Sequence, residues 1–414
     1  MSQSFTLPNL QAAISGSVAA FRSVTEYQPA GGEGSTVFPP TYEGGKYANV
    51  GYREEEETDR KLADQTLLDS VQSQANRMEL ALQTAWEDGQ LELPVVTVDF
   101  AGSDMPKVLR ITSLDAPHRV ADALIRDSLH QGVPFRKSEL GKRLDDVDNR
   151  NATALFELCP TALIFGLWDS TGPKGGLGAK FARAIVSEIV AHDVQIGVKT
   201  SSRIDPAQIQ LGAGPIYKSK DSDGIGWTID EEESQRSTKG KKEPVKLGKD
   251  GRPSEANHGN VTPTIADGGI TFKRALQTTV LSLTGLRRLH FPLKVGERAT
   301  PEANAAARTV LAAIGLCGAV LTREQGCDLR SRCQLFPTQA VEWEILDKPG
   351  VKPERFSLDG KQALQLVADA VAAARKANLP WNGKEIVLQP SPQLVALVRK
   401  SQELSVSTAS EEEE

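Results

Sequence analysis

The predicted fold depends most on residues 67–79, which read LLDSVQSQANRME. In and after this stretch, large or small apolar residues recur at steps of four and three. They are Leu67, Val71, Ala75, Met78, Leu82 and Ala85. This spacing places them on one face of a helix. The sequence therefore predicts an amphipathic helix over residues 62–86, which Gly89 ends.

The polar flanks of this predicted helix are rich in hydroxyl and amide groups. One flank carries Ser70, Gln74 and Arg77, and the next carries Asp69, Ser73 and Asn76. Residues three and four apart are neighbours on a helix, so each set forms a stripe. An ordinary solvated face carries mostly Lys and Glu. Two interpretations stay open, a solvated face or a set of hydrogen-bonding groups for a sugar-phosphate backbone.

Strands and helices are predicted to alternate around this helix. Strand-like patterns cover residues 95–100, 108–111, 161–168, 194–198, 270–274 and 286–291, and helical patterns cover 117–129, 181–191 and 300–321. Asp359 is placed to cap a further helix that closes before Pro380. Residues 28–51 form a long loop rich in glycine and proline. The predicted fold class is α+β.

Charge and length limit the classes of protein that remain. The chain has 414 residues, 39% of them hydrophobic, and carries 48 Lys and Arg against 54 Asp and Glu. Twelve of the acids lie in three blocks, residues 54–57, 230–233 and 411–414, whereas the basic residues are spread along the chain. A locally positive groove is therefore compatible with the net charge of −6.

The sequence favours a cytoplasmic protein without a membrane partner. The longest apolar stretch, residues 310–321, is too short to cross a bilayer and predicts a buried helix. The N-terminal residues lack an export signal. Four cysteines, at positions 159, 317, 327 and 333, fit a reducing compartment in which thiols stay free.

Signatures of common enzymes are missing from the sequence. It contains no P-loop, no His-Glu-x-x-His and no Gly-x-Ser-x-Gly, and its cysteines are too widely spaced for a paired-cysteine zinc site. We expect no cofactor, no metal site and no catalytic residue.

Two further groups of cations are candidates for phosphate contacts. Lys180 and Arg183, with Ser187 at the same helical spacing (i, i+3 and i+7), follow a glycine-rich turn at residues 172–178, at the start of a predicted helix. The second group surrounds an insert: Lys199, Ser201, Ser202 and Arg203 precede it, Lys273 and Arg274 follow it, and Arg287, Arg288 and His290 lie on the next predicted strand. Such cations could track a sugar-phosphate chain, or could simply protect edge strands from aggregation.

The insert itself looks poorly able to fold alone. Between Lys218 and Asn260 the only large apolar residues are Ile225, Trp227, Ile229, Val245 and Leu247. We expect this stretch to bury no core of its own.

Four longer stretches carry a resemblance to a known family. They are residues 38–42 (FPPTY), 68–77 (LDSVQSQANR), 160–170 (PTALIFGLWDS) and 201–205 (SSRID). In this order, over residues 20–320, the chain resembles the backbone subunit of type I-G (formerly I-U) CRISPR Cascade complexes, a member of the Cas-seven group of RAMP proteins.

The resemblance implies an RRM-like (ferredoxin-like) palm with a thumb insertion. It divides the chain into a loop-rich N-terminal segment (1–60), the palm with its insertions (61–200 and 270–345), a partly mobile thumb (200–270), a helical C-terminal segment (346–400) and an acidic tail (401–414). Such subunits stack along one guide RNA and present it to target DNA. Their partners are further copies, a cap and guide-processing subunit and a large subunit.

Positions matched to the family, together with the cations around the insert, give the predicted RNA-binding residues. They are Ser73, Gln74, Asn76, Arg77, Lys180, Arg183, Lys199, Ser202, Arg203, Lys273, Arg274, Arg287 and Arg288. The aromatic ribonucleoprotein box of ordinary RRM domains is missing, so base stacking on the sheet is not expected. A guide holder must accept any spacer, which favours a grip on phosphates and sugars.

Type I backbone subunits are not nucleases, so the resemblance implies that this chain is not a nuclease. Two alternatives stay open. One is a metal-dependent ribonuclease that cuts bound target RNA through Asp169 or Asp205. The other is a single-stranded nucleic-acid binder that works alone.

Overall fold

The computed structural model describes residues 3–103, 105, 107–170, 178–221, 224–237, 242–294 and 296–412. Over these residues the protein is a mixed α+β protein with several sheets. Its contacts separate two compact units. Unit 1 comprises Met1–Ser103, Val108–Ile196 and Gly269–Leu394, and unit 2 comprises Asp104–Lys107, Gly197–Gly268 and Val395–Glu414.

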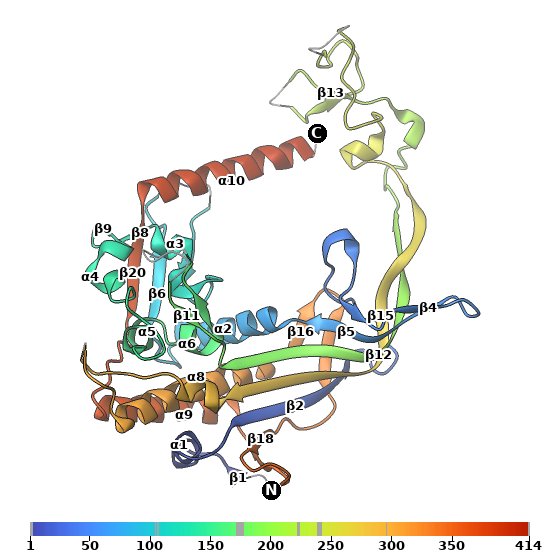
Figure 1. Cartoon of the computed structure of the whole chain (residues 1–414). Helices are drawn as coiled ribbons and strands as arrows, with labels where there is room; N and C mark the ends of the chain where they lie inside the picture. The colour runs from blue at the N-terminus through green and yellow to red at the C-terminus, as the bar shows by residue number, and fades with distance from the viewer. Residues whose placement is uncertain are drawn as a thin grey trace. The chain divides into compact units, whose positions relative to one another are not determined.

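A large, mostly antiparallel sheet forms the centre of unit 1 (Figure 1). Its middle strands run in the order β18 (Trp343–Leu346), β2 (Ala20–Pro29), β15 (Val261–Ser282), β12 (Ile185–Arg203) and β5 (Arg60–Asp69). The outer strands are β1 (Gln3–Ser4), β19 (Glu354–Ser357), β3 (Asn49–Val50), β4 (Arg53–Glu55), β16 (Cys327–Arg330) and β17 (Cys333–Pro337). Strands β12 and β15 continue beyond unit 1 into unit 2.

Two helices, α2 (Val71–Glu87) and α8 (Pro301–Glu324), cover one face of this sheet. Helices α1 (Leu7–Ser15) and α9 (Gly360–Lys376) pack against α8 (Figure 1). Helix α8 is long and apolar enough to cross a membrane, but 78% of its most apolar window is buried inside the fold. It is the predicted core helix.

The starts of α8 and α9 confirm their predicted caps. The Thr300 side chain accepts a hydrogen bond from the Ala303 amide, and Asp359 accepts one from Gln362. Each cap satisfies an amide that has no partner within the helix.

A second sheet of unit 1 has the strand order β7 (Arg110–Thr112), β6 (Val95–Asp99), β20 (Glu385–Pro390), β8 (Ser128–His130) and β9 (Val133–Pro134). Strands β10 (Leu167–Trp168) and β11 (Lys180–Phe181) form a separate hairpin. The short helices are α3 (Ala123–Arg126), α4 (Glu139–Lys142), α5 (Thr153–Leu158), α6 (Thr161–Phe165) and α7 (Leu283–Arg287), with single 3-10 turns at Glu43–Gly45, Arg119–Ala121, Phe135–Lys137, Leu211–Ala213 and Pro253–Ala256.

Unit 2 contains the rest of β12 and β15, the pair β13 (Tyr217–Lys218) and β14 (Trp227–Thr228), and most of α10 (Pro392–Glu412). Ile216, Leu247 and Ala256 are buried together, and Trp227 packs against them. The expectation that the insert buries no core is therefore wrong. Backbone hydrogen bonds between Ile216 and Leu247 (3.0 Å) and between Ile216 and Gly251 (2.8 Å) bring these scattered residues together.

Several predicted elements need correction. Residues 62–69 belong to strand β5, so the predicted helix begins only at Val71. Ser70, which precedes it, has an extended backbone and caps the helix. Residues 161–165 are helical rather than a strand. Residues 286–291 contain the end of α7 rather than a strand. The chain from residue 401, expected as a tail, continues α10 to Glu412.

Residues 185–191 are strand β12 rather than a helix. Ile185, Ser187 and Ile189 are buried, whereas Val186 and Glu188 are exposed. This alternation is the period of two that marks a strand. Most of the predicted glycine-rich turn, residues 172–177, lies outside the described residues, as do residues 413 and 414 of the tail.

Candidate nucleic-acid interface

The sheet face opposite α2 and α8 is open to solvent. Val24 of β2 and Val186 of β12 are 42% and 40% exposed there. The side chains on this face of the two central strands β2 and β15 are Arg22, Val24, Glu26, Gln28, Leu276, Thr278 and Val280. None of these residues is aromatic. The two central strands therefore lack the side chains on which RRM domains stack bases, although Phe336 of β17, which pairs with Gln28, is 62% exposed beside them.

Asp69, at the end of β5, is a buried hub on the covered face. Its carboxylate accepts hydrogen bonds from Gln74 Nε2 at 2.7 Å, Arg77 Nε at 3.0 Å and Arg330 at 3.3 Å. Arg77 also donates to the Leu329 carbonyl at 2.6 Å. The predicted RNA contact Arg77 thus connects α2 to strands β5 and β16.

Gln74 is also turned inward and is 1% exposed. Its Oε1 accepts hydrogen bonds from Gln277 Nε2 at 2.7 Å and Ser187 Oγ at 2.9 Å. The prediction that Gln74 contacts RNA is corrected, because removing this amide from its pocket would leave several buried polar groups without partners.

The network continues across the sheet from Gln277. Its Oε1 accepts from the Tyr27 hydroxyl at 3.1 Å and from Arg323 Nε at 3.0 Å. Burial raises the pKa of Tyr27 to about 12 and lowers the pKa of Arg323 to about 10. Arg323 also lies 5.1 Å from the centre of the Trp343 ring. These contacts fasten α2 and α8 to the sheet.

The two remaining predicted residues of α2 differ in exposure. Ser73 is half-buried in the first turn, where its amide donates to the Ser70 cap, whereas Asn76 is exposed. Helix α2 therefore offers Asn76, and the 28% of the Arg77 side chain that remains exposed, rather than a polar track.

Lys273 and Arg274 are consecutive exposed cations in β15, between buried Phe272 and Ala275. Within the part of the chain that the structure describes, no carboxylate forms an ion pair with either one. Because nothing neutralises them locally, they are available to an anion. They are the strongest predicted phosphate contacts in unit 1.

Within unit 2, Lys199 and Ser202 are exposed and Arg203 is half-buried. The buried Asp205 carboxylate accepts hydrogen bonds from the backbone amides of Gly259 and Ala207. These bonds, first that from Gly259, lower the pKa of Asp205, and Arg203 contributes less. Asp205 thereby closes the base of the insert.

Arg287 and Arg288 do not share a face with Lys273, because the expected strand is a helix. Arg287 donates to the carbonyls of Ala13, Ile14 and Val18 and holds the end of α1. Arg288 is exposed at the end of α7. Arg287 is half-buried and its guanidinium is engaged by these carbonyls, so it serves the fold, and its contact with RNA stays a prediction.

Lys180 lies in strand β11 of the β10–β11 hairpin and Arg183 follows this strand, so neither residue lies at the predicted helix start. Lys180 pairs with Trp168 across β10 and β11, and its Nζ lies 5.1 Å from the centre of the Trp168 ring. Arg183 Nε donates to the Phe165 carbonyl at 3.0 Å. Trp168 was missed as a site residue because its segment was expected to be a buried strand. The isolated tryptophan before the polar residues Asp169 and Ser170 was the available signal.

A buried ion pair lies behind this hairpin. Arg119 donates to both carboxylate oxygens of Glu79 at 2.6 Å and to the Gly166 carbonyl at 2.8 Å. Burial, followed by the charge of Arg119, lowers the pKa of Arg183. Two guanidinium groups thus face one carboxylate, which leaves positive charge beside the hairpin.

Asp169 and Asp205, the candidates for a nuclease, are both engaged in the fold. Asp169 is buried and forms an ion pair with Arg136. Among the described residues there is no group of three or more His, Cys, Asp or Glu side chains that could hold a metal ion.

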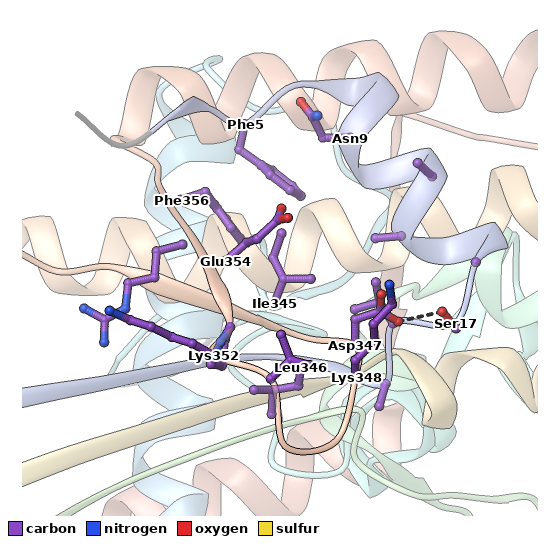
Figure 2. Close-up of a pocket in the computed structure, with 18 of the residues that line it drawn as sticks. Phe5, Asn9, Ser17, Ile345, Leu346, Asp347, Lys348, Lys352, Glu354 and Phe356 are labelled. Carbon is purple, nitrogen blue, oxygen red and sulfur yellow. Dashed lines mark hydrogen bonds between the residues drawn. The ribbon is translucent and has the colours of Figure 1, made fainter.

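A groove in unit 1 lies between α1 and the turn that joins β18 to β19, with a volume of about 730 Å³ (Figure 2). Phe5, Ile345 and Phe356 contribute apolar side chains, and Ser17 Oγ donates to Asp347 at 2.5 Å. Its lining contains no histidine or cysteine and none of the predicted RNA contacts. The groove is thus separate from the candidate interface.

The chain is similar to a known protein family over part of its length. One structure, titled "CRISPR RNA-guided surveillance complex, pre-nicking", contains a chain with 11% identity and a TM-score of 0.33; the alignment covers 93% of this chain and 99% of that one. No curated protein matches the sequence. Residues 21–196 match the family described as CRISPR-associated protein GSU0053 (Cas_GSU0053). Over strands β2 and β5, helix α2 and the β10–β11 hairpin, the chain is thus similar to a CRISPR-associated protein family.

Proposed function

We propose that the protein is a non-catalytic, guide-RNA-binding backbone subunit of a CRISPR surveillance complex. Several copies assemble along one guide RNA in the cytoplasm and present it for pairing with target DNA. The other subunits of a Cascade complex are its further partners. The similarity of residues 21–196 to a CRISPR-associated family supports this proposal.

The observation that carries the proposal is the strand order of the main sheet. Along the chain, β2, α2, β12, β15, α8 and β17 or β18 follow the pattern βαββαβ. Across the sheet, the last strands lie beside β2, and β15 lies between β2 and β12. This is the order of ferredoxin-like folds. It supports an RRM-like palm to which β5 adds an extra edge strand.

The length of β12 and β15 supports a thumb. They have 19 and 22 residues, against a usual strand length of about five or six. Residues 204–260 connect them and contain the small buried cluster around Leu247. A long hairpin that carries a small folded insert is the form we propose for the thumb.

The chemistry of the exposed residues supports phosphate contacts. Among the residues that the structure describes, no carboxylate pairs with Lys273 or Arg274, and the central strands β2 and β15 have no aromatic side chains on their open face. Contacts with phosphates position a nucleic acid without reading its sequence. A protein that holds guides of any spacer sequence requires this type of contact.

The positions of the two aspartates support a non-catalytic role. The Asp169 carboxylate is paired with Arg136, and the Asp205 carboxylate accepts two backbone amides. A carboxylate that holds a catalytic metal needs oxygen atoms facing the metal and its substrate. The structural partners of these two carboxylates compete with that use.

RNA recovered from the purified protein tests the proposal. The full chain is co-expressed with a CRISPR array and its neighbouring subunits, and bound RNA is extracted and sized. We expect one discrete RNA that contains repeat and spacer sequence. Protein without RNA would contradict the proposal. Magnesium-dependent cleavage of a complementary RNA that disappears in Asp169→Asn or Asp205→Asn would instead support the nuclease.

A further inference from the structure

Trp168 is unusual among the tryptophans of this protein because it is exposed. It is 55% exposed, whereas Trp343 and Trp381 are buried and Trp86 and Trp227 are half-buried. These are all five tryptophans of the chain. An indole ring is a large apolar surface whose π-face attracts other aromatic rings and cations. An exposed indole is therefore a candidate binding surface.

The β10–β11 hairpin holds this ring in a fixed place. Leu167 and Phe181 pair across the hairpin and are buried, 7% and 4% exposed, so they anchor one side of it. The next pair, Trp168 and Lys180, therefore points to the other side. Lys180 Nζ lies over the ring, 5.1 Å from its centre. The exposed indole is thus oriented before any ligand arrives, which reduces the entropy cost of binding.

Positive charge that the fold does not neutralise lies next to this ring. A methyl group at Gly166 would lie 3.0 Å from Arg183 Cγ, which places the Arg183 stem against the backbone two residues before Trp168. Among the described residues, no carboxylate forms a hydrogen bond or ion pair with Arg183. Glu79, whose charge acts on Arg183, is bound by Arg119, and Asp169 is bound by Arg136.

We propose that Trp168 is a stacking site for one nucleobase of single-stranded RNA, with Lys180 and Arg183 contacting the adjacent phosphates. Every nucleobase has a π-face, so stacking on an aromatic ring tolerates any sequence. The central strands β2 and β15 carry no aromatic side chain on the open sheet face, and this hairpin supplies one at a different position. The inference rests on the proposed function and adds to it a contact with a base.

The affinity of the full chain for RNA tests the inference. The probe is a fluorescently labelled oligouridine of about 12 nucleotides, within the range of known single-strand sites. We expect Trp168→Leu to weaken binding roughly 5- to 150-fold, the effect of losing one stacked base. Trp168→Phe, which keeps a ring, should retain most of the affinity. A probe with abasic sites should bind the wild type about as weakly as the intact probe binds Trp168→Leu.

Trp86→Leu is the matched control. Arg110 lies over the Trp86 ring, 5.9 Å from its centre, as Lys180 lies over Trp168, but Arg110 is paired with Glu385. We expect this variant to bind RNA like the wild type. If Trp168→Leu fails to fold, quenching of tryptophan fluorescence by RNA supplies the result: it should be present in the wild type and largely absent in Trp168→Phe.

Two results would overturn the inference, and they are distinguishable. In the first result, the wild type binds oligouridine, and either Trp168→Leu binds it with equal affinity or Trp168→Phe shows the same fluorescence quenching as the wild type. This result would refute the stacking site alone. In the second result, the wild type binds no single-stranded RNA. This result would refute the stacking site and the proposed RNA-binding function together.

Discussion

Two regions of unit 1 contain residue types that bind RNA in other proteins, but the structure uses them differently. Asp69, Gln74 and Arg77 form a buried network that joins α2 to the sheet. Lys273 and Arg274 on β15 are exposed and have no carboxylate partner among the described residues. Residue type alone does not distinguish these regions. Burial and pairing do, and they predict opposite effects of mutation on stability and on RNA binding.

The largest effect is expected for Asp69→Ala. It leaves Arg77 and Arg330 without their shared carboxylate, and loss of one partner from a buried pair costs about 3–5 kcal/mol. Chemical denaturation should show this decrease in the free energy of unfolding. Asp64→Ala is the control on the same strand, because Asp64 is exposed and its pair with Arg53 should contribute less than about 1 kcal/mol. Equal losses in the two variants would contradict the role of Asp69.

Gln74→Ala should have the next largest effect on stability. It leaves Gln277, Ser187 and Asp69 each short of a hydrogen bond, which should lower the free energy of unfolding by about 1–3 kcal/mol. RNA affinity should not change at temperatures where the variant is folded. Asn76→Ala, on the exposed side of the same helix, should leave stability unchanged. A Gln74→Ala variant that is as stable as the wild type but no longer binds RNA would contradict the structural role of Gln74.

The double variant Lys273→Ala/Arg274→Ala should leave the melting temperature unchanged and weaken RNA binding. The loss should be similar for all spacer sequences, because phosphate contacts carry no base information. Removing two phosphate contacts should also decrease the slope of log affinity against log salt by about 1.4 for a single strand. Lys361→Ala/Lys376→Ala on α9 is the control with the same change in charge. A slope that is the same in all three proteins would exclude Lys273 and Arg274 from the interface.

The smallest effect is expected for Asp205→Ala, and it should be local. Without the carboxylate, the amides of Gly259 and Ala207 lose their acceptor, so hydrogen exchange at these two positions should accelerate. Because the pKa of Asp205 is lowered in the folded state, its contribution is present above the unfolded pKa of about 4 and is lost as the pH falls through the folded value. If hydrogen exchange at Gly259 is as slow in the variant as in the wild type, the proposed role of Asp205 as acceptor for this amide is contradicted.

The sequence predicted those parts of the fold that have local signals. Helices α8 and α9 were found through Thr300, Pro301 and Asp359, whose cap chemistry acts within one turn. Residues 185–191 of strand β12 were predicted as a helix because their apolar residues also fit a helical spacing, and only pairing with β5 and β15 decides between the two, whereas the predicted strand at residues 194–198 is confirmed. The start of α2 was misplaced for the same reason, since Leu67 and Leu68 belong to a strand.

The candidate site was less predictable than the fold. Lys273 and Arg274 were identified because two adjacent cations in a strand are visible in the sequence. The burial of Gln74 was not visible, because it depends on Ser187 and Gln277, which lie 113 and 203 residues away along the chain. Trp168 was missed because its exposure depends on a hairpin whose second strand begins at Lys180.

The number of copies bound to guide RNAs of different length tests the central claim most directly. Complexes are assembled on guides whose spacers differ in length by regular steps, and their masses are measured by native mass spectrometry. A backbone subunit that polymerises along its guide should add copies stepwise as the spacer lengthens. A constant number of copies, whatever the length of the guide, would contradict the account.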